Sequence, residues 1–140
     1  MTDNSTFLQR WFEEVWCKGR EEAIYEMFGE NGIAHGLTDE NGNELRGAKH
    51  FAEFHKKFRA AIPDIKITVE ETVIEGDKLA GLCKVTGTHK GNEIGFAATN
   101  KPIEIYGLCL VKLKDGKIAE SWNQFDFMSL YQQLDVVAFK

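Results

Sequence analysis

Two apolar segments near the C-terminus, joined by Asp115-Gly116, limit the fold of this chain more than any other feature. In residues 103–113 and 117–126, apolar side chains recur between polar ones, which is typical of strands. Asp-Gly favours a two-residue hairpin turn with positive φ, and such a turn fixes the register of the strands on either side. The sequence therefore predicts an antiparallel hairpin in which Lys114 pairs with Lys117.

The register of this hairpin predicts which side chains share one face of the sheet. Side chains alternate along a strand, so residues that lie opposite each other also point the same way. The predicted opposite pairs are Cys109 with Trp122, Gly107 with Gln124, and Ile105 with Asp126. A carboxylate among apolar neighbours is costly to ionise, and such a group is suited to act as a general acid or base. Asp126 is therefore the first candidate for a catalytic residue.

A second interpretation of Asp126 stays open from the residues alone. Asp126 directly precedes residues 128–134, which are predicted to form a closing turn of helix. A carboxylate in that position can equally cap the helix by accepting hydrogen bonds from its first backbone N–H groups. The two interpretations place the side chain in opposite environments, an apolar pocket or the end of a surface helix.

Three helix-like segments occupy the first part of the chain. Apolar residues recur with helical spacing within residues 7–16, 23–28 and 51–62, and a glycine or proline ends each segment. A short strand is predicted between the second and third helices, over residues 33–36. The aromatic residues of the first helix are expected to belong to the core and to cover a cavity.

Beyond Pro63 the chain is typical of strands. Gly76-Asp77 predicts a tight turn between two long strands, and a loop runs from Gly91 to Pro102 before the hairpin. Helices followed by an antiparallel meander predict an α+β fold, in which three N-terminal helices pack on the concave face of a curved, antiparallel-rich sheet. Helices that cover only part of this face leave a cone-shaped pocket for a small molecule.

The composition limits the partners and cofactors that we expect. A formal net charge of -5 over 140 residues argues against nucleic-acid binding, which needs clustered Lys and Arg. Neither a signal peptide nor a membrane-spanning segment is recognisable, so a cytoplasmic protein is expected. The three cysteines lack C-x-x-C spacing and are expected to be free thiols, none in a setting that marks a nucleophile. Neither a metal site nor a nucleotide cofactor is expected, because no ligand spacing or G-x-G-x-x-G loop occurs.

Several short motifs, taken in order, resemble those of the SnoaL-like polyketide cyclases, often called ester cyclases, within the nuclear-transport-factor-2-like superfamily. The motifs are Arg46-Gly47-Ala48, Ile62-Pro63-Asp64, Gly87-Thr88-His89-Lys90-Gly91, Asp115-Gly116-Lys117-Ile118, and Trp122 four residues before Asp126. The resemblance runs from about residue 11 to 134. It implies a single SnoaL-like domain over residues 1–140 with the cone fold of that superfamily.

The resemblance also implies roles for particular residues. In the family, the aspartate that matches Asp126 is a general acid/base that closes a polyketide ring without metal or cofactor. His35 is the second catalytic candidate, since relatives often carry a histidine there beside the cavity. The residues expected to bind the substrate are Trp122, Gln124, Cys109, Ile105 and His55. The residues alone favour a hydrogen-bonded structural role for both histidines, in the core for His55. Cys109 departs from the His or Asp that relatives often carry at its position.

Two functions from different classes are therefore predicted. The first is a cofactor-free cyclase or isomerase, in which Asp126 transfers protons on a small apolar or aromatic carbonyl compound. The second is a non-catalytic, small-molecule-binding dimeric domain. In either case a homodimer is expected, because members of this fold commonly pair through the outer sheet face. That face is predicted to carry Phe125, Leu108 and Leu110.

Overall fold

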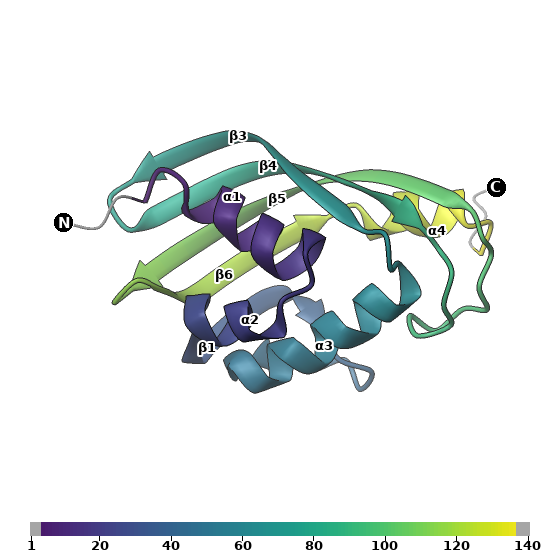
Figure 1. The fold of residues 1–140 in the computed structure, drawn as a ribbon, viewed down its shortest axis with the longest axis horizontal. Helices are drawn as coiled ribbons and strands as arrows, with labels where there is room; N and C mark the ends of the chain where they lie inside the picture. The colour runs from purple at the N-terminus through teal and green to yellow at the C-terminus, as the bar shows by residue number, and fades with distance from the viewer. Residues whose placement is uncertain (1–3, 137–140) are drawn as a thin grey trace.

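A curved six-stranded sheet wraps around the N-terminal helices in a computed structural model that describes residues 4–136 (Figure 1). The strand order is β2-β1-β6-β5-β4-β3, and all neighbours are antiparallel except β1 and β6. The strands are β1 (Phe28–Thr38), β2 (Glu44–Arg46), β3 (Lys66–Glu75), β4 (Lys78–Thr88), β5 (Pro102–Lys114) and β6 (Lys117–Phe125). This is the predicted α+β cone.

The helices follow the predicted segments closely. They are α1 (Phe7–Trp11), η1 (Phe12–Cys17), α2 (Glu21–Met27), α3 (Gly47–Ala61) and α4 (Phe127–Gln133). The segment η1 is a π-helix that continues α1, whereas the apolar spacing predicted one regular helix. The strand β1 is longer than residues 33–36, and β2 was not predicted because three residues at a sheet edge carry too little pattern. Of the helices in the described part of the chain, none is long and apolar enough to cross a membrane.

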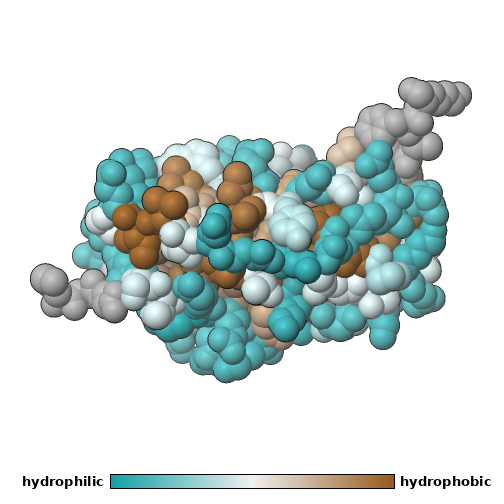
Figure 2. Space-filling model, turned by 90° about the horizontal axis from the view of Figure 1, so that it is seen from above, coloured by the Kyte–Doolittle hydropathy of each residue, from teal (hydrophilic) through white to brown (hydrophobic). Residues whose placement is uncertain are grey.

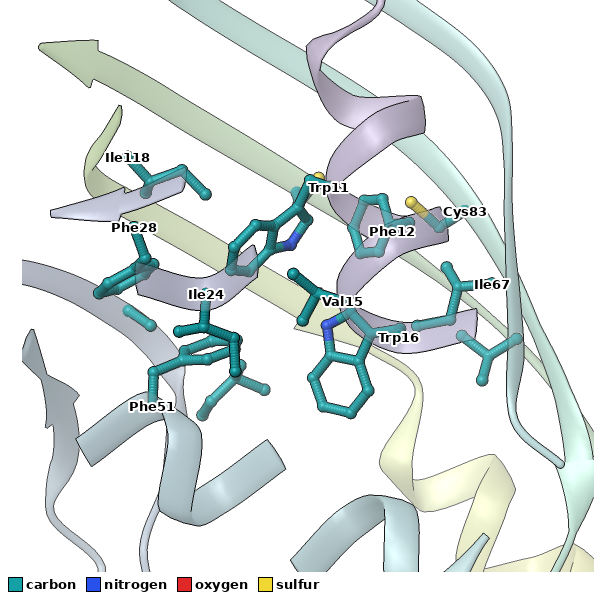
Figure 3. Packing of buried hydrophobic residues seen from close by; sticks show 14 of the residues in the cluster. Trp11, Phe12, Val15, Trp16, Ile24, Phe28, Phe51, Ile67, Cys83 and Ile118 are labelled. Atoms are coloured by element: carbon teal, nitrogen blue, oxygen red, sulfur yellow. The ribbon is translucent and has the colours of Figure 1, made fainter. Parts of the chain in front are cut away.

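The core consists of aliphatic and aromatic side chains between these helices and the inner sheet face (Figure 3). The ring of Phe51 on α3 lies 5.3 Å from Trp11 and 5.0 Å from Phe28, measured between centroids. Trp16 on η1 packs against Phe51 and Phe54 at 6.1 and 6.2 Å. Aromatic pairs at these separations add about 0.5–1.5 kcal/mol each beyond their buried area. They hold α3 and η1 at a fixed distance from the sheet.

A β-bulge in β6 determines which residues face the core. Lys114 pairs with Lys117 as predicted, but Lys112 pairs with Glu120 while Leu113 pairs with Ile118. Ala119 is therefore an extra residue in β6, and every residue after it is shifted by one position. Because side chains alternate, the shift exchanges the two faces of the strand.

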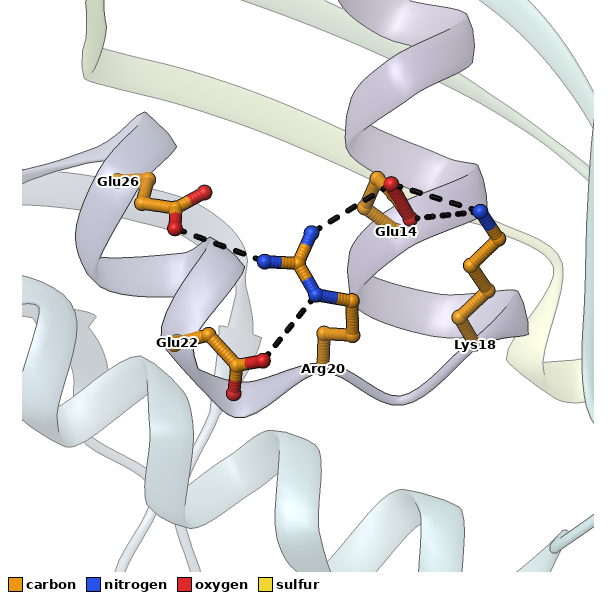
Figure 4. A network of polar contacts seen from close by, with 5 residues as sticks. All are labelled: Glu14, Lys18, Arg20, Glu22 and Glu26. Carbon is orange, nitrogen blue, oxygen red and sulfur yellow. Dashed lines mark hydrogen bonds and ion pairs between the residues drawn. The ribbon is translucent and has the colours of Figure 1, made fainter.

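Charged residues hold the short connection between η1 and α2 (Figure 4). The Arg20 guanidinium lies 3.4 Å from Glu14, 3.1 Å from Glu22 and 3.5 Å from Glu26, and Glu14 also pairs with Lys18 at 3.1 Å. The Glu22 and Glu26 side chains are mostly exposed, so solvent screens their ion pairs with Arg20 and each pair contributes little to stability. The network orients α2 rather than supplying much of the stability.

Two of the sequence motifs meet where α3 ends. The Asp64 carboxylate accepts hydrogen bonds from the backbone N–H and the hydroxyl of Thr88, at 2.7 and 2.9 Å. Both hydrogen bonds hold the end of β4 against the residues that follow α3. His89 fixes the following loop, since its ring Nδ1 lies 3.1 Å from the Thr99 hydroxyl and its backbone pairs with Asn100 and Lys101.

Candidate functional site

An apolar hollow lies between η1, α3 and the inner face of the sheet. We call it the inner cavity, and its volume is about 60 Å³. It is lined by Trp11, Phe12, Trp16, Leu37, Phe51, Phe54, Phe58, Ile65, Ile67, Val85, Ile105, Cys109, Val111, Ile118, Ser121, Asn123, Phe125 and Phe127. A single buried water needs about 10–15 Å³. The inner cavity therefore admits a small apolar group, and the rest of any larger ligand must lie outside it.

A second, wider hollow adjoins the inner cavity. We call it the outer hollow; its volume is about 890 Å³, and it lies between the β1–β2 connection, α3, α4 and residues 92–95. The two hollows share Leu37, Phe54, Phe58 and Phe127 in their linings. These four side chains therefore form the boundary that a ligand would cross. The arrangement suits a molecule with one small apolar end and a larger, more polar remainder.

The polar groups of the inner cavity come from β5 and β6. The Asn123 amide donates to the backbone carbonyl of His35 at 3.0 Å and to the Ser121 hydroxyl oxygen at 3.1 Å. These two bonds use both amide hydrogens, which leaves the Asn123 carbonyl oxygen as an acceptor and the Ser121 hydroxyl hydrogen as a donor. Ser121 is only 5 % exposed, so a ligand that pairs with its hydroxyl has little competition from water.

A pair of thiols lies beside these groups. Cys109 on β5 pairs in register with Asn123 on β6, and its sulfur lies close to Gly81 on β4, with the Cys83 thiol and the Gly81 N–H as the groups that act on its pKa. The Cys83 thiol, helped by that N–H, lowers the pKa of Cys109 against the opposing effect of burial. The hydrogen bond to Cys109 and burial raise the pKa of Cys83. No local pattern in the sequence indicates this contact, because Cys83 and Cys109 are 26 positions apart.

Asp126 does not face the inner cavity, which corrects the prediction from the hairpin register. It is exposed and forms the N-cap of α4, where its Oδ1 accepts a hydrogen bond of 2.9 Å from the backbone N–H of Ser129. The bulge at Ala119 is the reason, since it places Asp126 beside Tyr106 on β5, one position short of the place expected opposite Ile105. The capping interpretation of Asp126 is the one that the structure supports.

Trp122 and Gln124 lie on the outer face of the sheet, for the same reason. Trp122 pairs with Leu110 and Gln124 with Leu108, and neither residue lines the inner cavity. Phe125 was expected on the outer face and instead lines the inner cavity. All three positions are corrections that follow from the single extra residue in β6.

His35, the second catalytic candidate, does not line the inner cavity. Its ring contacts Glu44 through Nδ1 and Glu120 through Nε2, the latter at 2.7 Å, and stacks on Trp122 at 5.3 Å. The hydrogen bond to Glu120 raises the pKa of His35, and Glu44 adds to the effect against some desolvation. His35 is a paired imidazole on the outer side of the sheet.

The remaining candidates divide between core and cavity. His55 is buried, its Nε2 lies 2.5 Å from the Val15 carbonyl oxygen, and it does not line the inner cavity. Burial lowers the pKa of His55. A structural role therefore describes His55 better than a role in substrate binding. Cys109 and Ile105 do line the inner cavity, as predicted.

Sequence reasoning missed Ser121, Asn123 and Phe125, although one signal was present. Ile118 and Phe125 are both apolar and lie seven positions apart, an odd number. A regular strand would place them on opposite faces, so a strand that buries both requires a bulge between them.

Within residues 4–136, no group of three or more His, Cys, Asp or Glu side chains is arranged to hold a metal ion. A second polar pair, His50 and Asp39, lies in the outer hollow with an Nε2 to Oδ2 distance of 3.0 Å. His50 Nδ1 accepts a bond from the Arg46 N–H, and Asp39 also accepts from Asn41 and Asn43, so both side chains hold the β1–β2 connection.

The cone fold and the apolar inner cavity together define a small-molecule-binding domain with the nuclear-transport-factor-2-like fold. Comparison with known proteins supports this class. The model of the SnoaL-like polyketide cyclase family matches residues 6–134. The chain therefore belongs to the SnoaL-like polyketide cyclase family. Membership of this family supports a cyclase-like role in general terms.

Solved structures agree with this assignment. A candidate polyketide cyclase from Bacillus cereus ATCC 10987 is 30% identical, with 94% of this chain and 79% of that chain covered and a TM-score of 0.77. IdmH from Streptomyces antibioticus, a candidate polyketide cyclase, is 25% identical, with 96% and 99% covered and a TM-score of 0.82. A candidate SnoaL-like polyketide cyclase from Jannaschia sp. CCS1 is 19% identical, with 96% and 93% covered and a TM-score of 0.83, and shows the shared fold. No match was found among curated protein sequences.

Proposed function

We propose that this protein binds a small apolar or aromatic carbonyl compound, with an apolar end in the inner cavity and its remainder in the outer hollow. The observation that carries the proposal is a buried donor, Ser121, beside an acceptor on half-buried Asn123, within an otherwise apolar lining. A ligand pocket of this kind takes its affinity from apolar contact and its orientation from a few polar groups.

The polar pair suits one class of carbonyl compound in particular. The Ser121 hydroxyl can donate to a ligand carbonyl oxygen, while the Asn123 carbonyl oxygen can accept from a ligand hydroxyl. The enol form of a 1,3-dicarbonyl compound offers both groups, one carbon apart. Such compounds have an acidic carbon between two carbonyls, which is the kind of carbon that forms a ring by an aldol reaction.

The role of the protein in such a cyclisation would rest on positioning. Among the described residues, no carboxylate lines the inner cavity, so the proposal does not assign proton transfer to Asp126 or His35. Apolar walls that hold a flexible chain in a folded conformation supply the proximity on which an intramolecular reaction depends. Non-catalytic binding, the alternative function, uses the same contacts.

A titration with benzoylacetone tests the proposed function. Trp11 and Trp16 line the inner cavity, so binding there is expected to change tryptophan fluorescence; Trp122 is replaced by Phe to remove the outer-face signal. Val85→Phe fills the cavity and is expected to weaken binding at least about tenfold, the loss of roughly 1.4 kcal/mol. Val73→Phe, at a side chain that is 69% exposed on β3, is the matched control.

Equal binding to the two variants would contradict the proposal. So would a titration in which the protein without Trp122 shows no fluorescence change and no binding by calorimetry. Circular dichroism and urea unfolding of both variants confirm that each remains folded.

We also propose that the protein forms a homodimer through the outer sheet face. Leu108 and Leu110 are 57% and 39% exposed on β5, and Tyr106 is 47% exposed beside them. Their neighbours on β4 and β6 include Leu82 and Trp122. Figure 2, which views the molecule from above, shows apolar side chains gathered between polar ones on that side of the molecule. Exposed apolar side chains that gather on one face of a sheet are commonly covered by a partner.

A further inference from the structure

We propose that Cys109 is a site of covalent attachment for α,β-unsaturated carbonyl compounds that enter the inner cavity. This inference rests on the proposed function, because it takes Ser121 and Asn123 as the groups that orient the ligand. It goes beyond that function because it assigns the cavity a nucleophile and a chemical reaction.

The first support is position. Cys109 and Asn123 are directly opposite on β5 and β6, and both line the inner cavity. The Cβ atoms of directly opposite residues lie roughly 4.5–5.5 Å apart. The Ser121 hydroxyl is hydrogen-bonded to the Asn123 amide at 3.1 Å. A ligand whose carbonyl oxygen accepts a hydrogen bond from Ser121 would therefore have its α- and β-carbons near the Cys109 sulfur.

The second support is the surroundings of the sulfur. A thiolate is the nucleophilic form of cysteine, and hydrogen bonds to it favour this form. Cys109 Sγ lies close to Gly81 on the neighbouring strand, and the Cys83 thiol and the Gly81 N–H both favour its thiolate form. Cys83 is fully buried and does not line the inner cavity, so it acts as a donor to Cys109 and is shielded from the ligand. In Figure 3, Cys83 lies beside Phe12 on the side of the sheet that faces the helices.

The reaction is a conjugate addition that needs no oxidant or reductant. The Cys109 sulfur forms a bond to the β-carbon of the ligand, and the electrons of the carbon–carbon double bond move to give an enolate. The Ser121 hydroxyl stabilises the enolate oxygen by a hydrogen bond. The proton that leaves the Cys109 thiol is returned to the α-carbon, so that one S–H and one C=C are replaced by one C–S and one C–H.

The three cysteines of the chain provide internal controls. Cys17 on η1 is partly exposed and exchanges hydrogen bonds with the Ile67 backbone at 3.3 and 3.5 Å, outside the inner cavity. Cys83 is buried on β4 and does not line the inner cavity. A small enone that reacts by simple access is expected to label Cys17, whereas one that is bound first is expected to label Cys109.

The experiment uses cyclohex-2-enone and intact-mass spectrometry, with the site identified by peptide mapping. We expect one equivalent of adduct on Cys109, at a rate that saturates with enone concentration and falls at least about tenfold when the saturated cyclohexanone is present in excess. Cys109→Ser is expected to abolish this adduct, and Cys17→Ser to leave it unchanged. Protection by cyclohexanone is measured on the wild-type protein and does not depend on how a variant folds.

Labelling of Cys17 alone, or labelling of Cys109 at a rate that rises linearly and is not reduced by cyclohexanone, would overturn the inference. The reversible titration with benzoylacetone, made on the same preparation, separates this failure from failure of the proposed function. If benzoylacetone binds and Cys109 stays unmodified, the cavity is a binding site without a reactive thiol. If benzoylacetone does not bind, the proposed function fails and the inference fails with it.

Discussion

Asp126 illustrates how the role of one residue depends on a displacement of one position. Opposite Ile105 it would have been a carboxylate in an apolar pocket; beside Tyr106, one position short of Ile105, it caps α4 and faces solvent. Its single described side-chain hydrogen bond, to the Ser129 N–H, is the interaction that a helix N-cap makes. The residue type alone is compatible with both roles.

Replacing Asp126 therefore tests stability rather than chemistry. We expect Asp126→Ala to lower the free energy of unfolding by about 1 kcal/mol, because a backbone N–H of α4 loses its partner. Asp126→Asn retains a capping oxygen and is expected to change the stability by less than half of that. Urea unfolding measures both variants. An Asp126→Asn protein of normal stability that fails to bind benzoylacetone would argue against the structural role.

His35 is expected to make the stability depend on pH. Its pKa is raised in the folded protein by the hydrogen bond to Glu120, so the folded state favours the imidazolium. The resulting stabilisation is complete below the unfolded value of about 6.5 and is lost as the pH rises through the higher folded value.

His35→Gln removes this dependence and provides the test. The difference in free energy of unfolding between wild type and His35→Gln is expected to be largest near pH 5.5 and to shrink toward about pH 8. His55, whose pKa is lowered by burial, has the opposite effect in both proteins and cancels in the difference. A difference that stays constant between these pH values would show that the contacts with Glu120 and Glu44 do not favour the charged ring.

At the scale of elements, the bulge in β6 separates what the sequence can predict from what it cannot. The helices, the two tight turns and the pairing of Lys114 with Lys117 follow from local patterns of apolar residues, glycine and aspartate. The extra residue at Ala119 depends instead on the fit of β6 against β1 and β5 together. Both neighbours must be in place before one register buries more apolar surface than the other.

The consequence for the candidate site is direct. Cys109 and Ile105 lie on β5, which has no extra residue. Both were predicted to line the cavity, and both do so. Trp122 and Gln124 lie after the bulge and were assigned to the wrong face. The spacing of Ile118 and Phe125 was the one local sign of the shift.

Deletion of Ala119 tests this account of β6. Without the extra residue, Trp122 and Gln124 would be directed inward and Phe125 outward, so we expect a loss of roughly 3 kcal/mol or more in the free energy of unfolding, or failure to fold. Deletion of Ala97, an exposed residue in the loop between β4 and β5, is the control and is expected to cost far less. Equal stability of the two deletion proteins would show that Ala119 does not set the register.

At the scale of the whole molecule, the two faces of the sheet have different tasks. The inner face encloses the cavity, and the outer face presents Leu108 and Leu110 to a proposed second copy of the chain.

Replacing both leucines by Glu is expected to convert a dimer into a monomer without loss of benzoylacetone binding. Light scattering after gel filtration measures the mass, with Tyr25→Glu on α2 as a control for added surface charge. A wild-type monomer at micromolar concentration, or a dimer that survives both substitutions, would contradict the proposed interface.

The central claim is that the ligand site is the inner cavity and that the polar contacts come from Ser121 and Asn123. A crystal structure of the protein with benzoylacetone tests it most directly. The account predicts ligand density between Trp16, Phe54 and Val85, with a ligand oxygen within hydrogen-bonding distance of the Ser121 hydroxyl. Ligand density beside Asp126 or His35, with the inner cavity empty of ligand, would contradict it.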